Sequence, residues 1–202
     1  MRNSFLLPAL TILFCLASVA QSSHPVSTPK LEFFGGYSFL HQYDNGEFQG
    51  WEASLSGNIN RWFALKGDFS GHYAEEDFAA VTLPPPSSFT FPAETFHQSI
   101  HYFLGGPEFS YRRTKWRLHA HALVGAAHGH QSLIVHNPPP GFMVGSNGVE
   151  DTGFAFGFGA GGDWMFSKRI GWRVAQADCL RHRFDGEYHD NVRISSGLVF
   201  HF

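Results

Sequence analysis

From Leu31 to the carboxy terminus, apolar and polar residues alternate in steps of two, and no apolar run there is long enough to cross a bilayer as a helix, which needs about 20 residues. The chain is nevertheless rich in phenylalanine, with 22 residues. Only 15% of its residues are Asp, Glu, Lys or Arg, against about 25% in soluble domains. Hydrocarbon admits only helices and closed barrels, because every backbone polar group needs an internal partner. The pattern therefore predicts a transmembrane β-barrel.

The alternation predicts eight antiparallel strands, at about residues 31–40, 50–58, 62–73, 97–111, 116–122, 154–164, 170–181 and 192–202. Two of these strands are irregular. Pro107 lies inside the fourth and indicates a bulge or a locally broken ladder. Arg173 is out of phase with Gln176 and Asp178, which predicts a bulge near Val174. Because an even number of strands brings both termini to one side, we expect an all-β, eight-stranded, up-and-down antiparallel barrel.

The segments between the strands sort into short turns at residues 58–61, 112–115 and 167–169 and longer loops at 43–48, 74–96, 128–152 and 182–190. The two longest loops each contain a triple proline, which predicts extended segments without helix. Short turns and long loops alternate in barrels whose short turns face the periplasm. Basic residues gather in the short turns, at Arg61, Arg112, Arg113, Lys115, Lys168 and Arg169.

The charged residues inside the strands lie on their polar faces. On a lipid face each basic residue would cost about 2–4 kcal/mol at the midplane, so these faces must point inward. An eight-stranded barrel has an interior just wide enough for side chains to fill. We therefore predict a salt-bridged polar plug made of Glu32, Glu52, Lys66, Asp68, Glu108, Arg117, Asp163, Arg173, Asp178 and Arg193. A narrow or gated pore is the alternative, because small inward residues such as Gly157, Gly159 and Gly161 could leave space.

Both ends of the chain carry targeting features. A basic start, an apolar run over residues 5–19 and Ser18-Val19-Ala20 predict a signal peptide cleaved after Ala20. Residues 21–30 would then be a periplasmic lead-in and residues 31–202 the barrel. Cleavage would leave Cys179 alone, without an intramolecular disulfide partner. Four tryptophans flank the short turns, where an interfacial aromatic girdle is expected: Trp62, Trp116, Trp164 and Trp172.

The closing residues Val199-Phe200-His201-Phe202, together with the signal peptide, the eight strands and the basic short turns, resemble the small outer-membrane barrels of the outer-membrane-protein-A-like superfamily. The resemblance implies that Leu198, Phe200 and Phe202 form the insertion signal read by the barrel-assembly machinery. It also implies a monomer in the bacterial outer membrane, surrounded by lipid and lipopolysaccharide. The peptidoglycan-binding domain of the best-known member is absent here, so tethering to the cell wall is not implied.

These features favour a structural or loop-mediated role without catalysis. A lipid A-modifying enzyme is one alternative, with His130-Gln131-Ser132 and Glu150 as a base, nucleophile and orienting acid, although the flanking sequence does not resemble the known deacylases. A soluble, lipocalin-like ligand binder with its apolar faces inward is another. It leaves the tryptophan girdle and the terminal phenylalanine unexplained.

The 13 histidines raise the question of a metal site. His119 and His121 share an inward strand face, and such a pair can supply two ligands to zinc or copper. Because no cysteine partner or compact ligand motif accompanies them, we predict that they fill polar lumen positions and that the protein holds no metal or cofactor. A net charge of −3 and the lack of a basic stripe argue against nucleic-acid binding.

Overall fold

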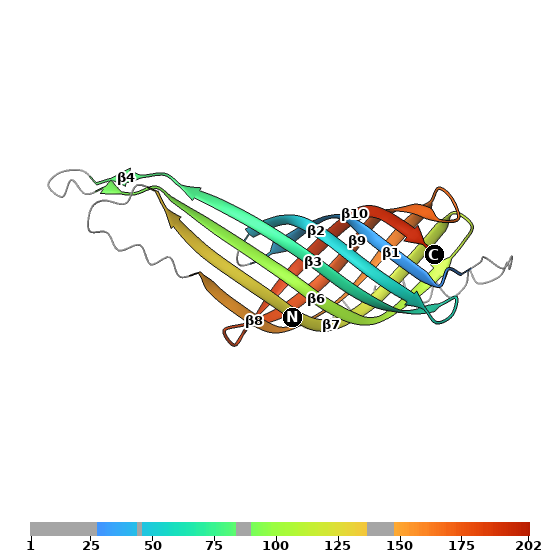
Figure 1. The fold of residues 1–202 in the computed structure, drawn as a ribbon. Helices are drawn as coiled ribbons and strands as arrows, with labels where there is room; N and C mark the ends of the chain where they lie inside the picture. The colour runs from blue at the N-terminus through green and yellow to red at the C-terminus, as the bar shows by residue number, and fades with distance from the viewer. Residues whose placement is uncertain (1–27, 44–45, 84–89, 137–147) are drawn as a thin grey trace, which may run out of the picture.

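The computed structural model describes residues 28–43, 46–83, 90–136 and 148–202. They form a closed antiparallel barrel in the order β1-β10-β9-β8-β7-β6-β3-β2 (Figure 1). Its strands are β1 (Leu31–Gln42), β2 (Gly46–Asn58), β3 (Phe63–Phe78), β6 (Glu94–Arg112), β7 (Trp116–Val135), β8 (Val149–Met165), β9 (Ile170–Phe184) and β10 (Glu187–His201). The predicted eight-stranded up-and-down barrel is confirmed. None of the described residues belongs to a helix long and apolar enough to cross a membrane.

The barrel closes where the first strand pairs with the last. The β1–β10 ladder runs from Glu32 opposite His201 to Gln42 opposite Asn191. Gly36 faces Gly197 in this ladder, and a Cβ atom at either position would collide with the opposite backbone. Phe202 continues the seam beyond β10, because its carbonyl accepts a hydrogen bond from the backbone N–H of Lys30 at 2.8 Å. The two ends of the barrel chain therefore lie side by side.

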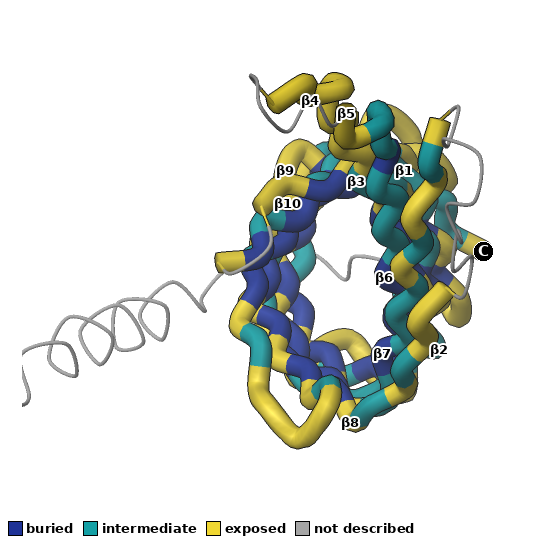
Figure 2. The backbone as a smooth tube through the Cα atoms, turned by 90° about the vertical axis from the view of Figure 1, so that its left-hand side faces the viewer, coloured by how far each residue is buried: buried dark blue, intermediate teal, exposed yellow. Residues whose placement is uncertain are grey.

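The two faces of each strand meet different surroundings. Outward side chains are apolar and exposed, including Leu55, Leu65, Phe103, Phe109 and Phe158. Inward side chains are mostly polar or charged and buried, so buried and exposed residues follow one another along the strands (Figure 2). A soluble barrel has the opposite arrangement, with its apolar side chains inside. The lipocalin-like alternative is therefore wrong for this chain.

Both irregular strands behave in ways that the sequence anticipates. In the β9–β10 ladder Gln176 pairs with Ser195, but the next pair joins Arg173 to Gly197, so two residues of β9 oppose one of β10. The two residues opposite Ser196, Val174 and Ala175, both face outward, which confirms the predicted bulge. Around Pro107 the register stays constant on both sides, so its effect is a locally interrupted ladder with β7 and not a bulge.

The predicted long loops are wrong in extent, because much of this sequence is strand. β3 continues to Phe78, β6 begins at Glu94 and β7 runs to Val135. The expected loop at 182–190 is a tight hairpin whose turn residues, Asp185 and Gly186, have φ values of 48° and 86°. Where the strands extend beyond the barrel wall, both of their faces meet water. The alternation of apolar and polar residues therefore disappears, although backbone pairing continues. The triple prolines and the predicted signal peptide lie outside the described residues.

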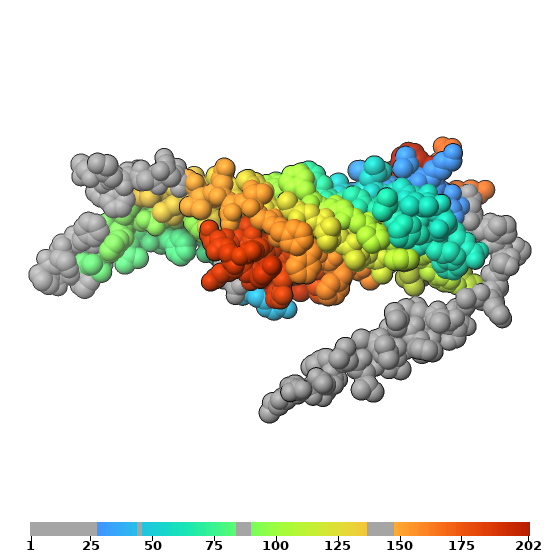
Figure 3. All heavy atoms as spheres, turned by 90° about the horizontal axis from the view of Figure 1, so that it is seen from below, coloured from blue at the N-terminus to red at the C-terminus, as the bar shows by residue number. Residues whose placement is uncertain are grey.

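Three strands extend beyond the barrel wall and form what we call the outer sheet, residues 74–78, 94–98 and 131–135. A short hairpin of β4 (Val81–Thr82) and β5 (Thr90–Phe91) lies at its tip. Figure 3 shows the green segments of β3 and β6 reaching well past the red and orange strands β9 and β10. We call this end of the barrel the outer end, and the end with the three short turns the inner end.

Candidate functional site in the barrel lumen

The structure places all ten charged residues predicted for the lumen inside the barrel, each no more than 4% exposed. They divide into two groups along the barrel axis. The inner cluster contains Glu32, Glu108, Arg117, Asp163 and Arg173, together with Arg112. The middle cluster contains Glu52, Lys66, Asp68, Asp178 and Arg193.

Arg117 organises the inner cluster. Its guanidinium lies 3.0 Å from Glu32 and 2.6 Å from Asp163, and it also donates to Glu108. Arg173 donates to the second oxygen of Asp163 at 2.8 Å. These residues come from β1, β6, β7, β8 and β9, so one guanidinium ties distant strands together. Charge-assisted pairing of this kind satisfies buried carboxylates that would otherwise be strongly unfavourable.

Arg193 has the same role in the middle cluster. It donates to Asp68 and to Asp178, both at 2.8 Å, and lies 3.5 Å from Glu52. Lys66 adds a second cation 3.3 Å from Asp68. The five charged side chains are fully or almost fully buried. The cluster is therefore a buried ionic network across β2, β3, β9 and β10.

Gln176 links the two clusters. Its side-chain oxygen accepts hydrogen bonds from Arg173 at 2.6 Å and from Lys66 at 3.3 Å. Its side-chain nitrogen donates to Glu52 at 2.9 Å and to Asp178 at 2.8 Å. Because the amide uses both its donor and its acceptor, the two clusters form one continuous ionic plug in the part of the lumen nearer the inner end.

The expectation that Arg112 belongs to a short turn is wrong. It is the last residue of β6, and its side chain contacts Glu32 and donates to Asn58 at 2.8 Å. It shares the inward phase of Glu108 and Ser110, so two-residue counting continued to the strand end would have found it. Its long side chain reaches into the lumen from the rim.

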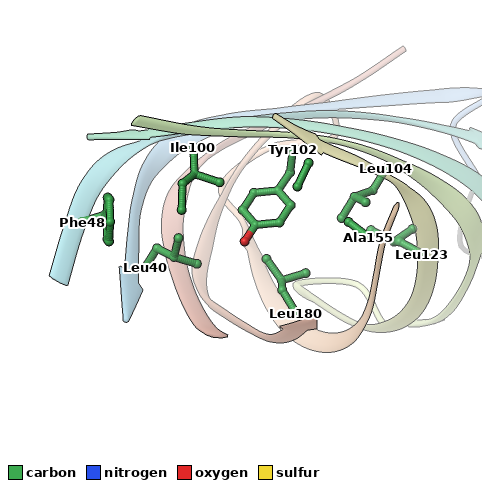
Figure 4. Packing of buried hydrophobic residues seen from close by; sticks show 9 residues of the cluster. Leu40, Phe48, Ile100, Tyr102, Leu104, Leu123, Ala155 and Leu180 are labelled. Atoms are coloured by element: carbon green, nitrogen blue, oxygen red, sulfur yellow. The ribbon is translucent and has the colours of Figure 1, made fainter. Parts of the chain in front are cut away.

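An apolar layer lies above the middle cluster, and the sequence prediction missed it. Figure 4 shows its side chains converging inside the barrel from several strands. Its members are Leu40, Phe48, Ile100, Tyr102, Leu104, Leu123, Ala127, Ala155 and Leu180. The hydroxyl of Tyr102 bonds to His182 Nδ1 at 2.9 Å, so the one polar tip in the layer has a partner. These residues separate the ionic plug from the outer mouth.

The small residues of β8 do not leave an open passage. The space next to Gly159 is taken by the carboxylate of Asp178, and the space next to Gly161 by the imidazole of His119. The expectation that these glycines could provide room for a pore is therefore wrong. They provide room for large side chains from the neighbouring strands. Above the apolar layer a cavity of about 170 Å³ opens at the outer mouth, lined in part by Gln42, Ile100, Phe184 and His189.

The proposed lipid A-modifying triad is only partly assembled. His130 Nδ1 lies 3.2 Å from a carboxylate oxygen of Glu150, so the base and the acid meet. Ser132 lies two residues along β7, and the described structure shows no hydrogen bond between its hydroxyl and His130. All three sit at the outer end, beside the lumen mouth.

The four tryptophans of the predicted girdle lie on the outside of the inner end. Trp116 and Trp164 contact edge to face with ring centroids 4.4 Å apart, and Trp172 pairs with Trp164 across β8 and β9. Trp62 stacks on Tyr111 at 5.8 Å. The fifth tryptophan, Trp51, lies toward the outer end, paired with Tyr37 and close to Tyr73. Aromatic side chains thus mark both margins of the apolar exterior.

The residues expected to form the insertion signal share the outer face of the closing seam. Leu198 and Phe202 are largely exposed, and Phe200 packs against Phe33 of β1 with ring centroids 6.4 Å apart. This geometry places an apolar, aromatic row along the outside of the last strand. Its recognition by the assembly machinery stays a prediction.

The closed eight-stranded meander, apolar outside and charged inside, is the architecture of the small outer-membrane β-barrels. Solved structures that share it include the following two. Ail, the attachment invasion locus protein of Yersinia pestis, superposes with a TM-score of 0.54 at 14% identity, over 86% of this chain and 100% of Ail. Neisserial surface protein A (NspA) gives a TM-score of 0.54 at 8% identity, over 85% and 96% of the two chains. No family model and no curated protein matches the sequence. The resemblance inferred from the sequence is therefore confirmed at the level of the fold.

Proposed function

We propose that this protein is an outer-membrane barrel closed to solutes, which anchors the outer sheet and acts through it at the cell surface. The observation that carries this proposal is the filled lumen. Two ionic clusters and an apolar layer succeed one another along the axis, and Arg117, Arg193 and Leu40 are among their fully buried members. Steady conduction would require these side chains to separate. A narrow or gated pore is accordingly the second candidate, and it would require a large rearrangement of the side chains that fill the lumen.

The exterior supports residence in the membrane. A largely apolar surface lies between two sets of aromatic residues, and ionisable side chains such as His101, His128 and Arg181 lie at its outer margin. Such a surface is stable in lipid and unfavourable in water. Signal-peptide cleavage after Ala20, folding by the barrel-assembly machinery and contact with lipopolysaccharide as a monomer belong to the same proposal.

The outer sheet is suited to binding because its backbone is incompletely paired. Residues 74–78 pair with β6 but have no partner on β2 in the described structure, and residues 132–135 likewise have none on β8. Exposed strand edges are sites where another extended segment can add. Phe78, Leu133 and Ile134 are also exposed nearby. A rigid barrel that displays such a sheet fits a surface interaction role better than catalysis.

Conductance in planar bilayers tests the closed lumen. Purified, refolded protein is expected to give no steady channel at any applied voltage, while a large general porin inserted in the same bilayer serves as the positive control. Reproducible steps of constant size from this protein would overturn the proposal and favour the pore.

Cysteine labelling of intact cells tests the orientation. In a Cys179→Ala background, Thr82→Cys at the tip of the outer sheet should react with a membrane-impermeant maleimide. Lys168→Cys, in a short turn at the inner end, should react only after the outer membrane is permeabilised. Both positions are exposed, so reactivity reports on location. The reverse pattern would place the outer sheet in the periplasm and exclude a surface role.

A further inference from the structure

We propose that Glu108, His119 and His121 form a zinc site inside the barrel lumen. Glu108 on β6 lies directly opposite His121 on β7, and His119 is two residues away on the same inward face. One potential ligand atom from each residue lies within 4.8 Å of the other two. All three side chains are at least 95% buried. The third ligand comes from a neighbouring strand, so the sequence spacing of the two histidines could not reveal it.

The hydrogen bonds of the two imidazoles orient them as metal ligands. His121 Nε2 lies 2.9 Å from a carboxylate oxygen of Asp178, and His119 Nε2 lies 3.4 Å from the side-chain oxygen of Gln176. Both partners are acceptors, which assigns the proton of each ring to Nε2 and leaves a lone pair on each Nδ1. Arg193 and Arg173 hold the two acceptors in place. This is the outer-shell arrangement of metal-bound histidines.

The inner nitrogens have no hydrogen-bonding partner. Nδ1 of His119 and Nδ1 of His121 are both buried and unpaired, although His119 Nδ1 lies 3.9 Å from a carboxylate oxygen of Asp163. A buried acceptor without a partner costs about 1–3 kcal/mol. A metal ion bound through these atoms would remove that cost. Two such imidazoles beside the carboxylate of Glu108 are the observation that marks this cluster as a candidate metal site.

The ligand set favours zinc. Two imidazole nitrogens and one carboxylate suit Zn²⁺ better than Mg²⁺ or Ca²⁺, which prefer oxygen ligands. Glu108 accepts from Arg117 through Oε1, while its Oε2 has only a long bond of 3.4 Å from Ser56.

Zinc must enter while the barrel forms, because the lumen is filled once it has closed. The test is therefore to refold the full chain in detergent with Zn²⁺, remove free metal by chelator and gel filtration, and measure bound zinc by mass spectrometry. The expected result is about one zinc ion per chain, lost in the double variant His119→Gln/His121→Gln. The matched control, His128→Gln/His130→Gln, removes two histidines from the outer end of the same strand and should keep the zinc.

A second measurement covers the case in which the lumen variant does not fold. Wild-type protein refolded with Cu²⁺ in place of zinc should give an electron paramagnetic resonance spectrum with coupling to two imidazole nitrogens, resistant to added chelator. Absence of stoichiometric metal in the folded wild-type chain overturns the proposal. So does chelator-sensitive metal that disappears in the His128→Gln/His130→Gln control.

Discussion

Arg193 meets carboxylates from three other strands: Asp68 on β3, Asp178 on β9 and Glu52 on β2. Each of these acids is buried, so none can be satisfied by water if the guanidinium is removed. Breaking a buried ion pair by deleting one partner is more harmful than replacing the whole pair, because an uncompensated charge remains. The stability effects of single substitutions in the lumen are therefore coupled, because removing one charge leaves its partners buried without compensation.

Arg193→Met keeps most of the side-chain volume and removes the charge. We expect it to lower the free energy of unfolding by about 3–5 kcal/mol, measured by urea titration of tryptophan fluorescence in lipid vesicles. The control is Arg181→Met, which breaks the Arg181–Asp190 pair at the exposed outer margin, where both side chains are about half exposed. Exposed pairs contribute little, so its unfolding midpoint should stay near wild type. Equal midpoints for the two variants would show that the lumen network adds nothing.

The strands differ in how strictly their sequence holds them in register. In β9 the residues Val174 and Ala175 both face outward. This bulge accommodates one extra residue, so that Arg173 and Gln176 on either side of it both still face inward. In β7 the inward residues Arg117, His119 and His121 follow one another at strict two-residue steps. A one-residue shift in such a strand moves its whole inward set to the lipid face.

Deletion of Ala175 should therefore be tolerated, since it restores simple alternation between Arg173 and Gln176. Deletion of Ala120 should prevent folding, because Arg117 and His119, or the inward residues above them, would then face lipid at about 2–4 kcal/mol for an arginine. Gels of boiled and unboiled outer-membrane fractions measure this: the Ala175 deletion should keep the heat-dependent shift, and the Ala120 deletion should lose it. The opposite order would mean that the bulge itself is required.

The sequence predicted those elements whose two faces meet contrasting surroundings. The eight strands, the inward set of charges and the bulge at Val174 all follow from one lipid face and one lumen face. The outer sheet was predicted as loop, because Glu75, Glu76 and Asp77 lie in succession where both faces meet water. The partners of Arg117 and the proposed ligand role of Glu108 depend on the register between strands. This register cannot be read from the sequence of any single strand. The apolar layer was missed because its inward leucines look like lipid-facing residues.

The whole molecule consists of a barrel and a projecting sheet that share three strands. β3, β6 and β7 pass from one to the other without a break, and the outer-sheet hydrogen bonds begin where β2 and β8 stop pairing. Ala74 packs against the apolar layer, but no member of the ionic clusters or of that layer lies within residues 75–78 or 94–98. The barrel should therefore be stable without them.

Replacing residues 76–96 by Asn-Gly, which joins the paired residues Glu75 and His97 through a tight turn, tests this division. The shortened protein should reach the outer membrane and keep the wild-type temperature of its heat-dependent gel shift, while losing whatever surface binding the intact chain shows. A fall in that temperature would indicate that the outer sheet stabilises the barrel and is not a separate functional part.

Several contacts of the ionic plug join strands that are not neighbours in the barrel. Arg193 of β10 reaches Asp68 of β3, Arg117 of β7 reaches Glu32 of β1, and Gln176 of β9 reaches Glu52 of β2. An open, half-assembled sheet can form none of these three contacts, so Arg193, Glu32 and Glu52 would each lack a partner that the closed barrel supplies. Closure therefore adds ion pairs that the open sheet lacks, and the last seam, β1 with β10, brings these partners together as it completes the backbone ladder. The cross-lumen contacts thereby favour the finished barrel over an open sheet.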